Sequence, residues 1–177
     1  PPYSFEAVVY GGDENDIAEA IYDTKAVTAT DHSGVRGTSV SRTVVSDVNG
    51  QSFDIEFSRP SELQIDITVD IIINDTYAGD SEIIDSVVQY IGGVDTSGTE
   101  VLGTGVSENV RIDKIRDVIV NDDNGVVGLD YSVDSDPLST TPSATAVDGL
   151  EVVEVGANEV AQTDGTDGSI TINTREQ

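Results

Sequence analysis

The stretch LQIDITVDIIINDTYAGDSEIIDSVVQYIGG, residues 63–93, contains a strand pattern followed directly by a helix pattern. Apolar residues occupy every second position over residues 63–73, which predicts a long strand with one buried face. Asp80 or Ser81 can cap the helix that follows, and Gly92-Gly93 supplies its C-terminal stop. The apolar stripe of this helix consists of Ile83, Ile84, Val87, Val88 and Ile91.

Upstream of this stretch, the pattern predicts a strand, a helix and a loop. Residues 3–9 alternate as in a strand, and residues 13–27 follow helical spacing with Asp13 as the N-cap. Residues 28–37 are loop-like. One face of the strand is formed by Tyr3, Phe5, Ala7 and Val9. The inward stripe of the helix is formed by Ile17, Ala20 and Ile21.

Two extended runs, SVSRTVVSDVNGQSFDIEFSRP over residues 39–60, surround the dipeptide Asn49-Gly50. Because Asn and Gly both tolerate positive φ, this dipeptide predicts a β-hairpin closed by a type I′ turn. Pro60 ends the second run.

Downstream, residues 92–109 form a long glycine-rich connection, which is typical of functional or adaptable loops. Residues 110–120 predict a helix, and residues 126–136 predict a strand. A Pro/Ser/Thr-rich linker over 136–149 then leads to two short strands and a loop over 150–174. The inward residues of the helix are Ile112, Ile115 and Ile119.

The order of these elements lacks a regular strand–helix–strand period. It therefore predicts an α+β fold of two small mixed domains, in which helices pack on one face of each sheet. We place the domains at residues 1–60, which hold the strand, helix and hairpin, and residues 61–177, which hold the long strand, two helices and the C-terminal strands.

The chain is strongly acidic, with 34 Asp and Glu against 8 Lys and Arg and a net charge of −26. Such a surface repels itself at low ionic strength and is screened in molar salt, which favours a salt-rich cytoplasm. A disordered acidic chain is the alternative, but the amphipathic segments argue against it. Direct binding of nucleic acid is not expected, because phosphate neutralisation needs a basic face. No apolar run is long enough for a membrane span, and no signal peptide is expected.

Catalytic chemistry is not expected from this sequence. Cysteine is absent, and the single histidine, His32, lies among small polar residues in a predicted loop, where we expect it to be exposed. Carboxylate pairs are too frequent here to indicate a general acid and base. We therefore predict that the chain is not an enzyme and needs no cofactor. Methionine is also absent, so we expect that residue 1 is not a translation start and that the chain is a fragment or has been processed.

Three oxygen-rich runs are weak candidates for calcium loops: residues 11–16, 121–125 and 163–168. None of them has the ligand spacing of an EF-hand loop. Solvated turns are the favoured interpretation, and we predict no metal site.

Three of the eight bases gather within six residues, at Arg111, Lys114 and Arg116, on the predicted helix that also carries Asp113 and Asp117. One interpretation is local pairing at i,i+3, Asp113 with Arg116 and Lys114 with Asp117. The other is a basic docking face for an acidic neighbouring subunit. These three bases are therefore the candidate subunit contact.

Several segments together resemble the baseplate J-like family of contractile phage tails. They are SFEAVVYGGDENDIAEAIYDTKAVT (4–28), DVNGQSFDIEFSRPSELQIDITVDIII (47–73), GVSENVRIDKIRDVIVNDDNGVVGLDYSV (105–133) and VEVGANEVAQTDG (153–165). The resemblance lies in the order of segments and in short motifs such as GGD, F-x-R-P and NEVA, and the family's N-terminal part is missing.

The resemblance implies a structural wedge component of a viral tail baseplate, in the virion, that forms a ring and joins the central hub to sheath-side proteins. Its expected partners are the hub, neighbouring wedge copies and other tail proteins, assembled in the high-salt cytoplasm of a haloarchaeal host. The family offers no catalytic residues. The alternative is a halophilic extracellular or receptor-binding module that uses calcium-binding acidic loops.

Overall fold

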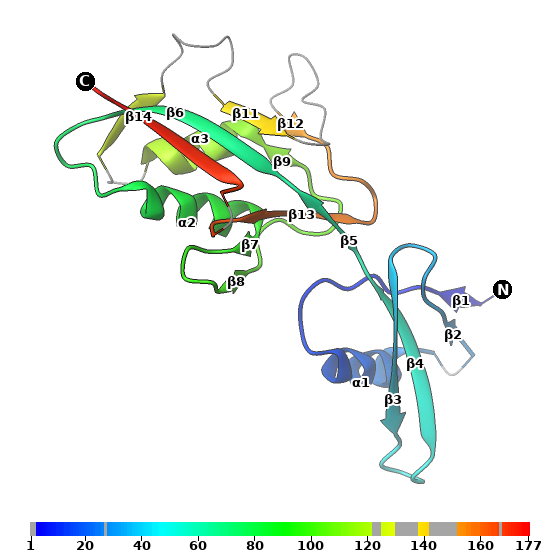
Figure 1. Cartoon of the computed structure of the whole chain (residues 1–177). Coiled ribbons are helices and arrows are strands. Elements are labelled where there is room, and N and C mark those ends of the chain that lie inside the picture. Colours follow the sequence, from blue (N-terminus) through cyan, green and yellow to red (C-terminus); the bar gives the residue numbers. More distant parts are fainter. Residues whose placement is uncertain (1–2, 27, 122–124, 130–137, 142–151, 167) are drawn as a thin grey trace. The chain divides into compact units, whose positions relative to one another are not determined.

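A computed structural model of the chain describes residues 3–26, 28–121, 125–129, 138–141, 152–166 and 168–177 (Figure 1). The chain divides into two compact units, Pro1–Ser61 (unit 1) and Glu62–Gln177 (unit 2). The division lies one residue from the expected boundary between residues 60 and 61. Both units combine helices with small sheets, so the fold is α+β, as predicted.

Unit 1 is a long antiparallel hairpin with one helix packed against it. The hairpin consists of β3 (Thr38–Val45) and β4 (Ser52–Arg59), and α1 (Glu14–Thr24) contacts both strands. A short parallel pair, β1 (Ser4–Phe5) and β2 (Thr30–Asp31), lies beside β4. The core consists of Ala18, Val44 and Ile55, with Ile21 and Tyr22 packed against it.

The strand expected over residues 3–9 is wrong in extent. Only Ser4–Phe5 is a strand, and the Tyr3 side chain is 83% exposed. The chain then crosses to β4, where the Val9 amide donates to the Ser58 carbonyl at 2.9 Å and the Ser58 amide donates to the Ala7 carbonyl at 2.8 Å. Residues 7–9 therefore form an isolated bridge to β4 instead of continuing the strand β1.

The helix of unit 1 begins as predicted, but one inward residue is corrected. The Asp13 carboxylate accepts from the Asn15 and Asp16 amides, as an N-cap does. Ala20 is exposed and Ala18 is fully buried in its place. The helix therefore turns its 17–18–21–22 stripe to the hairpin.

The hairpin is confirmed, but its turn is not type I′. Only Gly50 has positive φ, at 70°, and the loop runs from Ser46 to Gln51, whose backbones pair at 2.8 Å. The Gly50 amide also donates to the Ser46 carbonyl at 2.8 Å. A longer turn needs a left-handed residue at one position only, which glycine supplies.

Unit 2 is organised around β6 (Asp66–Ile73). β14 (Ile170–Glu176) pairs with it in parallel, while β10 (Val126–Leu129) and β11 (Leu138–Thr141) pair with it antiparallel. A second sheet has the order β5 (Ser61–Gln64), β13 (Glu159–Asp164), β7 (Gly93–Val94) and β8 (Glu100–Val101). β12 (Val152–Val153) pairs with β9 (Val110–Arg111).

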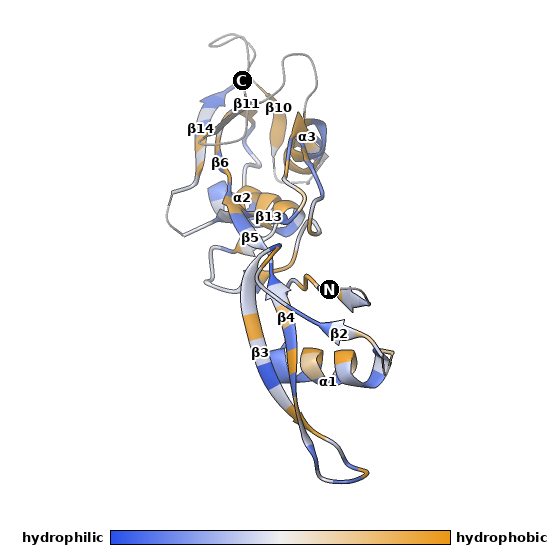
Figure 2. Ribbon diagram, turned by 90° about the vertical axis from the view of Figure 1, so that its right-hand side faces the viewer, coloured by the Kyte–Doolittle hydropathy of each residue, from blue (hydrophilic) through white to orange (hydrophobic). Residues whose placement is uncertain are grey.

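Two helices, α2 (Asp80–Ile91) and α3 (Ile112–Asn121), contact each other in unit 2. Figure 2 shows hydrophobic residues along α2, α3 and β10. The predicted inward residues of α3 are confirmed, since Ile112, Ile115 and Ile119 are at most 3% exposed. The four most buried residues of α2 are Ile83, Val87, Val88 and Ile91, whereas Ile84 is half-buried.

The long strand expected over residues 63–73 keeps its buried face but changes partners at Ile65. Alternate side chains from Ile65 to Ile71 are at most 1% exposed. The Ile65 amide donates to the Gln162 carbonyl next to β5, whereas the Ile67 amide donates to the Ser169 carbonyl just before β14. One continuous apolar alternation therefore serves two sheets.

Three further expectations in unit 2 change. Gly79 is the N-cap of α2, and the Asp80 carboxylate accepts from the Tyr77 hydroxyl instead of capping the helix. Residues 138–141, expected in a linker, form β11 because β6 offers them an antiparallel edge. Of the strand expected over 126–136, residues 126–129 form β10 and the rest lies outside the described residues.

The glycine-rich connection over 92–109 is anchored at its start and at Thr104, while most of residues 97–109 are exposed. The Thr104 hydroxyl and amide both donate to the Ile91 carbonyl, at 2.9 and 3.0 Å. Gly93 lies so close to β13 that an added Cβ would stand 1.8 Å from the Thr163 carbonyl oxygen. Across the described ranges, no helix has the length and hydropathy needed to cross a bilayer.

Candidate subunit-contact site

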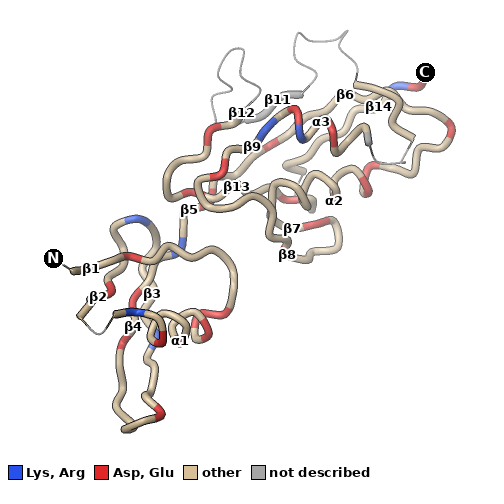
Figure 3. The backbone as a smooth tube through the Cα atoms, turned by 180° about the vertical axis from the view of Figure 1, so that it is seen from behind, with Lys and Arg blue, Asp and Glu red and all other residues tan. Residues whose placement is uncertain are grey.

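The predicted basic cluster lies where β9 leads into α3 (Figure 3). The buried isoleucines of α3 fix which side of the helix faces outward. The side chains of Arg111 and Lys114 are 58% and 52% exposed, while Arg116 is half-buried. Arg111 and Lys114 are therefore the accessible part of the candidate contact.

Arg111 forms a two-pronged ion pair with Asp113. Its Nε and Nη2 donate to the two carboxylate oxygens at 2.9 and 2.5 Å. The hydrogen bond and charge of Asp113 raise the pKa of Arg111, and the hydrogen bond from Arg111 lowers the pKa of Asp113. The Arg111 amide donates to the Tyr90 hydroxyl of α2 at 3.0 Å, so the backbone under this pair is held by the neighbouring helix.

The local pairing expected on α3 is half right. Lys114 pairs with Asp117 at 3.4 Å, as predicted, but Asp113 pairs with Arg111, two positions before it, rather than with Arg116. Residues 111–117 hold three bases and two acids, which gives a local charge of +1 in a chain of −26. The segment remains positive relative to its surroundings even after local pairing.

A second polar cluster, in unit 1, was not predicted. His32, expected to be exposed, is half-buried and lines a depression of about 360 Å³ with Ser4, Phe5, Glu6, Val35 and Arg36. The His32 amide donates to the Phe5 carbonyl at 3.1 Å, which extends the β1–β2 pairing. Pairing of two short strands therefore brings the histidine to Glu6.

Glu6 accepts most of the hydrogen bonds in this cluster. One of its carboxylate oxygens, Oε1, accepts from the Ser58 hydroxyl at 2.6 Å and from the Val35 and Arg36 amides at 3.0 and 2.9 Å. The Ser58 hydrogen bond lowers the pKa of Glu6, burial opposes this shift, and the two amides and nearby His32 add to it. The Ser58 hydroxyl itself accepts from the Gly34 amide at 2.9 Å. The geometry ties the loop before β3 to β4.

Where they are described, the acidic runs use their oxygens within turns. Asp13 caps α1, and the Asp164 carboxylate accepts from the Thr166 amide and hydroxyl, both at 2.7 Å. Residues 122–124 of the run 121–125, and residue 167 of the run 163–168, lie outside the described residues. Within the described part of the chain, no group of three or more His, Cys, Asp or Glu side chains is arranged to hold a metal ion.

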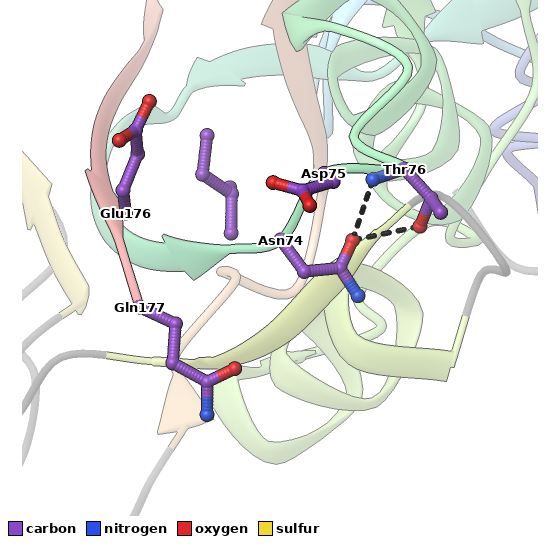
Figure 4. A pocket seen from close by; sticks show the side chains of 6 residues that line it. Asn74, Asp75, Thr76, Glu176 and Gln177 are labelled. Carbon is purple, nitrogen blue, oxygen red and sulfur yellow. Dashed lines mark hydrogen bonds between the residues drawn. The ribbon is translucent and has the colours of Figure 1, made fainter.

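A depression of about 480 Å³ lies between the end of β6 and the end of β14 (Figure 4). Asn74 shapes it, because its side-chain oxygen accepts from the Thr76 amide at 2.9 Å and from the Thr76 hydroxyl at 2.7 Å. Asp75 and Glu176 also line it. Its polar contacts are those of a turn between a strand and a helix.

Several of the short motifs quoted from the sequence contact one another. In unit 1, Arg59 of F-x-R-P donates to the carbonyls of Val9, Gly11 and Gly12 at 3.1, 2.5 and 2.8 Å. Gly11 and Gly12 both have positive φ, at 68° and 76°. Glycine adopts this backbone without strain, which explains why two glycines precede the helix cap.

In unit 2, the GVSEN segment binds the GANEVA segment. The Ser107 amide donates to the Glu159 carbonyl at 2.9 Å, and its hydroxyl donates to the Ala157 carbonyl at 2.6 Å. The Asn109 side chain accepts from the Val155 amide at 2.9 Å. Segments about fifty residues apart in sequence thus lock together through residues of both motifs.

The sequence could have indicated the Arg59 contact, because Arg59 is the one arginine that directly precedes a proline. It held no comparable signal for the Glu6 cluster, since Glu6 is one of 34 acids.

A scan against models of known protein families finds no match to this chain, and a search of curated proteins also finds none.

Proposed function

We propose that this chain is part of a structural wedge subunit of a contractile-tail baseplate, which forms a ring and joins the central hub to the sheath side. The observation that carries the proposal is the contact between motifs: GGD with F-x-R-P, and GVSEN with GANEVA. These contacts stabilise the fold of each small unit. A subunit of an assembly needs such rigid units.

Two exposed bases, Arg111 at the end of β9 and Lys114 on α3, support a role in subunit contact. An assembly of acidic subunits needs surfaces at which like charges do not dominate. Arg111 and Lys114 supply such a surface, and each is positioned by an adjacent carboxylate that orients it without removing it from solvent. An exposed ion pair with a single contact, such as Lys114–Asp117 at 3.4 Å, is weak, so an incoming carboxylate can exchange with Asp117.

The acidic composition supports assembly in a salt-rich cytoplasm, and hence a haloarchaeal virus or a related tail-like machine. At a net charge of −26, copies of the chain meet only when the surrounding salt screens their mutual repulsion. Hub, sheath-side proteins and neighbouring wedge copies are the proposed partners. Catalysis and cofactors have no part in this proposal.

The decisive experiment is sedimentation of the native protein in molar salt. The pelleted particles are identified by electron microscopy and mass spectrometry. The proposal expects the chain in tail particles together with sheath or tube proteins. A chain that stays alone, or that fractionates with the cell envelope, contradicts the proposal and favours a receptor-binding module.

Charge reversal tests the contact on α3. We expect the double variant Arg111→Glu/Lys114→Glu to pellet less with tail particles and to unfold at a midpoint close to that of the unaltered protein, because both side chains are exposed. The matched control, Arg111→Lys, keeps the charge and should pellet normally. Normal pelleting of the double variant would remove this surface from the proposal.

A further inference from the structure

β3 forms an open edge of the hairpin in unit 1 (Figure 1). It pairs with β4 over eight consecutive positions, from Thr38–Arg59 to Val45–Ser52, without a bulge. The other side of β4 is bound within unit 1: the Ser58 amide donates to Ala7 and the Glu56 amide donates to the Asp31 carboxylate. In the described part of unit 1, β3 has no strand on its outer side.

The backbone groups at this edge follow from the register. The Ser46 amide donates to Gln51, so alternate β3 residues from Val44 back to Thr38 direct their N–H and C=O groups toward β4. The residues between them direct these groups outward: Ser39, Ser41, Thr43 and Val45. Among these outward groups, the Ser41 carbonyl accepts a 2.7 Å hydrogen bond from Arg42.

This edge carries little of the usual protection against strand pairing: apart from Arg42, which donates to the outward Ser41 carbonyl, no charged side chain lies on it. Natural edges are made short, bulged, or interrupted by proline and lysine. β3 is eight residues of Ser, Thr, Val and one Arg, and the Arg42 side chain is drawn toward Glu14 of α1 by an ion pair. At the end of the strand the Val45 side chain is 58% exposed.

The charge pattern indicates the partner. Residues 32–46 form the longest run of the chain without Asp or Glu, and they contain Arg36 and Arg42. A basic partner would be drawn to the carboxylates elsewhere on the surface. Two copies that each carry a net charge of −26 repel each other least where their surfaces lack acids, so an acid-free edge suits the same edge of a second copy.

We propose that β3 pairs antiparallel with β3 of a second copy, so that two hairpins form one four-stranded sheet. This deepens the proposed function, on which it rests only for the expectation that copies associate. A two-fold axis beside Ser41 sets Ser41 opposite its own copy, Ser39 opposite Thr43, and Arg42 opposite Val40 rather than opposite another arginine. The three outward pairs supply about six backbone hydrogen bonds, and small hydroxyl side chains meet on one face.

The first test is the oligomeric state of the full chain in molar KCl, measured by sedimentation equilibrium over roughly a hundredfold range of concentration. We expect a dimer that dissociates on dilution. Ser41→Pro removes an outward N–H at the axis, and should raise the dissociation constant by about tenfold or more. The matched control, Ser41→Ala, keeps the N–H and should stay within about threefold. A monomer throughout, or a proline variant that dimerises normally, overturns the proposal.

Hydrogen exchange gives a readout at single residues. In the dimer, the outward amides of Ser39, Ser41 and Thr43 should exchange slowly, and dilution should speed them. The inward amides of Val40 and Val44 report whether the β3–β4 ladder is intact. A dimer with fast outward amides uses another surface and overturns the proposal.

Should Ser41→Pro fail to fold, Ser41→Glu replaces it. This variant keeps the backbone N–H and sets two carboxylates against each other across the axis, so it should also be monomeric, whereas a normal dimer would contradict the proposal. Because these measurements use the purified chain, a monomer overturns strand pairing and leaves the tail-particle sedimentation as a separate test.

Discussion

Single residues fix the local geometry of this protein where the backbone takes unusual paths. In unit 1, the guanidinium of Arg59 gathers three carbonyls that Gly11 and Gly12 turn toward it. It also lies 5.5 Å from the centre of the Phe57 ring. An arginine suits this arrangement better than a lysine, because the N–H donors of its planar guanidinium point in several directions and can reach several carbonyls at once.

Replacement of Arg59 should therefore destabilise unit 1. We expect Arg59→Ala to lower the free energy of unfolding by about 3 kcal/mol, since hydrogen bonds from a charged group are lost and carbonyls are left without donors. Arg59→Lys should recover only part of this loss. The control, Arg42→Ala, breaks an exposed ion pair with Glu14 and should cost less than about 1 kcal/mol. Denaturant unfolding in molar KCl measures all three, and equal losses for Arg59→Ala and Arg42→Ala would contradict the role of the clamp.

Glu6 should make stability depend on pH. Its pKa is lowered in the folded protein, mainly by the Ser58 hydroxyl. Its contribution is therefore present above the pKa of the unfolded chain, about 4.3, and is lost as the pH falls through the lower folded pKa. Glu6→Gln should lower the unfolding midpoint at neutral pH, and the difference from the unaltered protein should shrink in acid.

The control for Glu6→Gln is Glu19→Gln, which removes one carboxylate from the exposed side of α1. Thermal unfolding from neutral pH down to about pH 3 compares the variants, a range that spans the ordinary pKa of glutamate. A constant difference between Glu6→Gln and the unaltered protein over this range would show that the carboxylate does not act through its charge.

At the scale of elements, close backbone approach decides where strands meet. β7 joins β13 only because Gly93 lacks a side chain, at a φ of 128° and with the Thr163 carbonyl against it. Two short pieces of the 92–109 segment, β7 and β8, therefore join the second sheet, although the composition of the segment is that of an open loop. The absence of a side chain at Gly93, rather than the strand propensity of the residues, determines this pairing.

Gly93→Ala should disrupt the pairing of β7 with β13. Gly98 is a matched control, because it also has positive φ, at 82°, but an added Cβ there meets nothing within 4 Å. Gly98→Ala should cost about 1–2 kcal/mol through backbone strain alone. Gly93→Ala should cost at least about 2 kcal/mol more through the clash with Thr163, measured as the change in unfolding free energy. Equal costs would mean that the backbone at Gly93 yields easily.

At the scale of the whole molecule, net charge dominates. With 34 acids and 8 bases, self-repulsion opposes the folded state at low ionic strength. In 1 M salt the Debye length falls to about 3 Å, so only neighbouring charges still interact.

We therefore expect the thermal unfolding midpoint to rise steeply with KCl up to about 1 M and more slowly beyond it. Calorimetry over a series of KCl concentrations measures this dependence. Equal stability in fresh water and in molar KCl would contradict the interpretation of the chain as a protein of salt-rich cytoplasm.

Periodicity alone determined much of this protein. The buried face from Ile65 to Ile71, the inward stripes of α2 and α3, and the α+β class follow from the spacing of apolar residues. Burial of a face is a local property, because each residue's side is set by its position along its own element. The basic cluster of residues 111–116 was visible in the sequence for a different reason, namely its contrast with the acidic composition of the chain.

Only the tertiary structure decided which segments meet. It divided one strand pattern between two sheets at Ile65, drew residues 138–141 out of an expected linker onto β6, and paired Asp113 with Arg111. It also brought Glu6 to Ser58 across more than fifty residues. Hydrogen-bond partners and close approaches depend on distant parts of the chain, whereas the apolar pattern of one element records only which of its faces is buried.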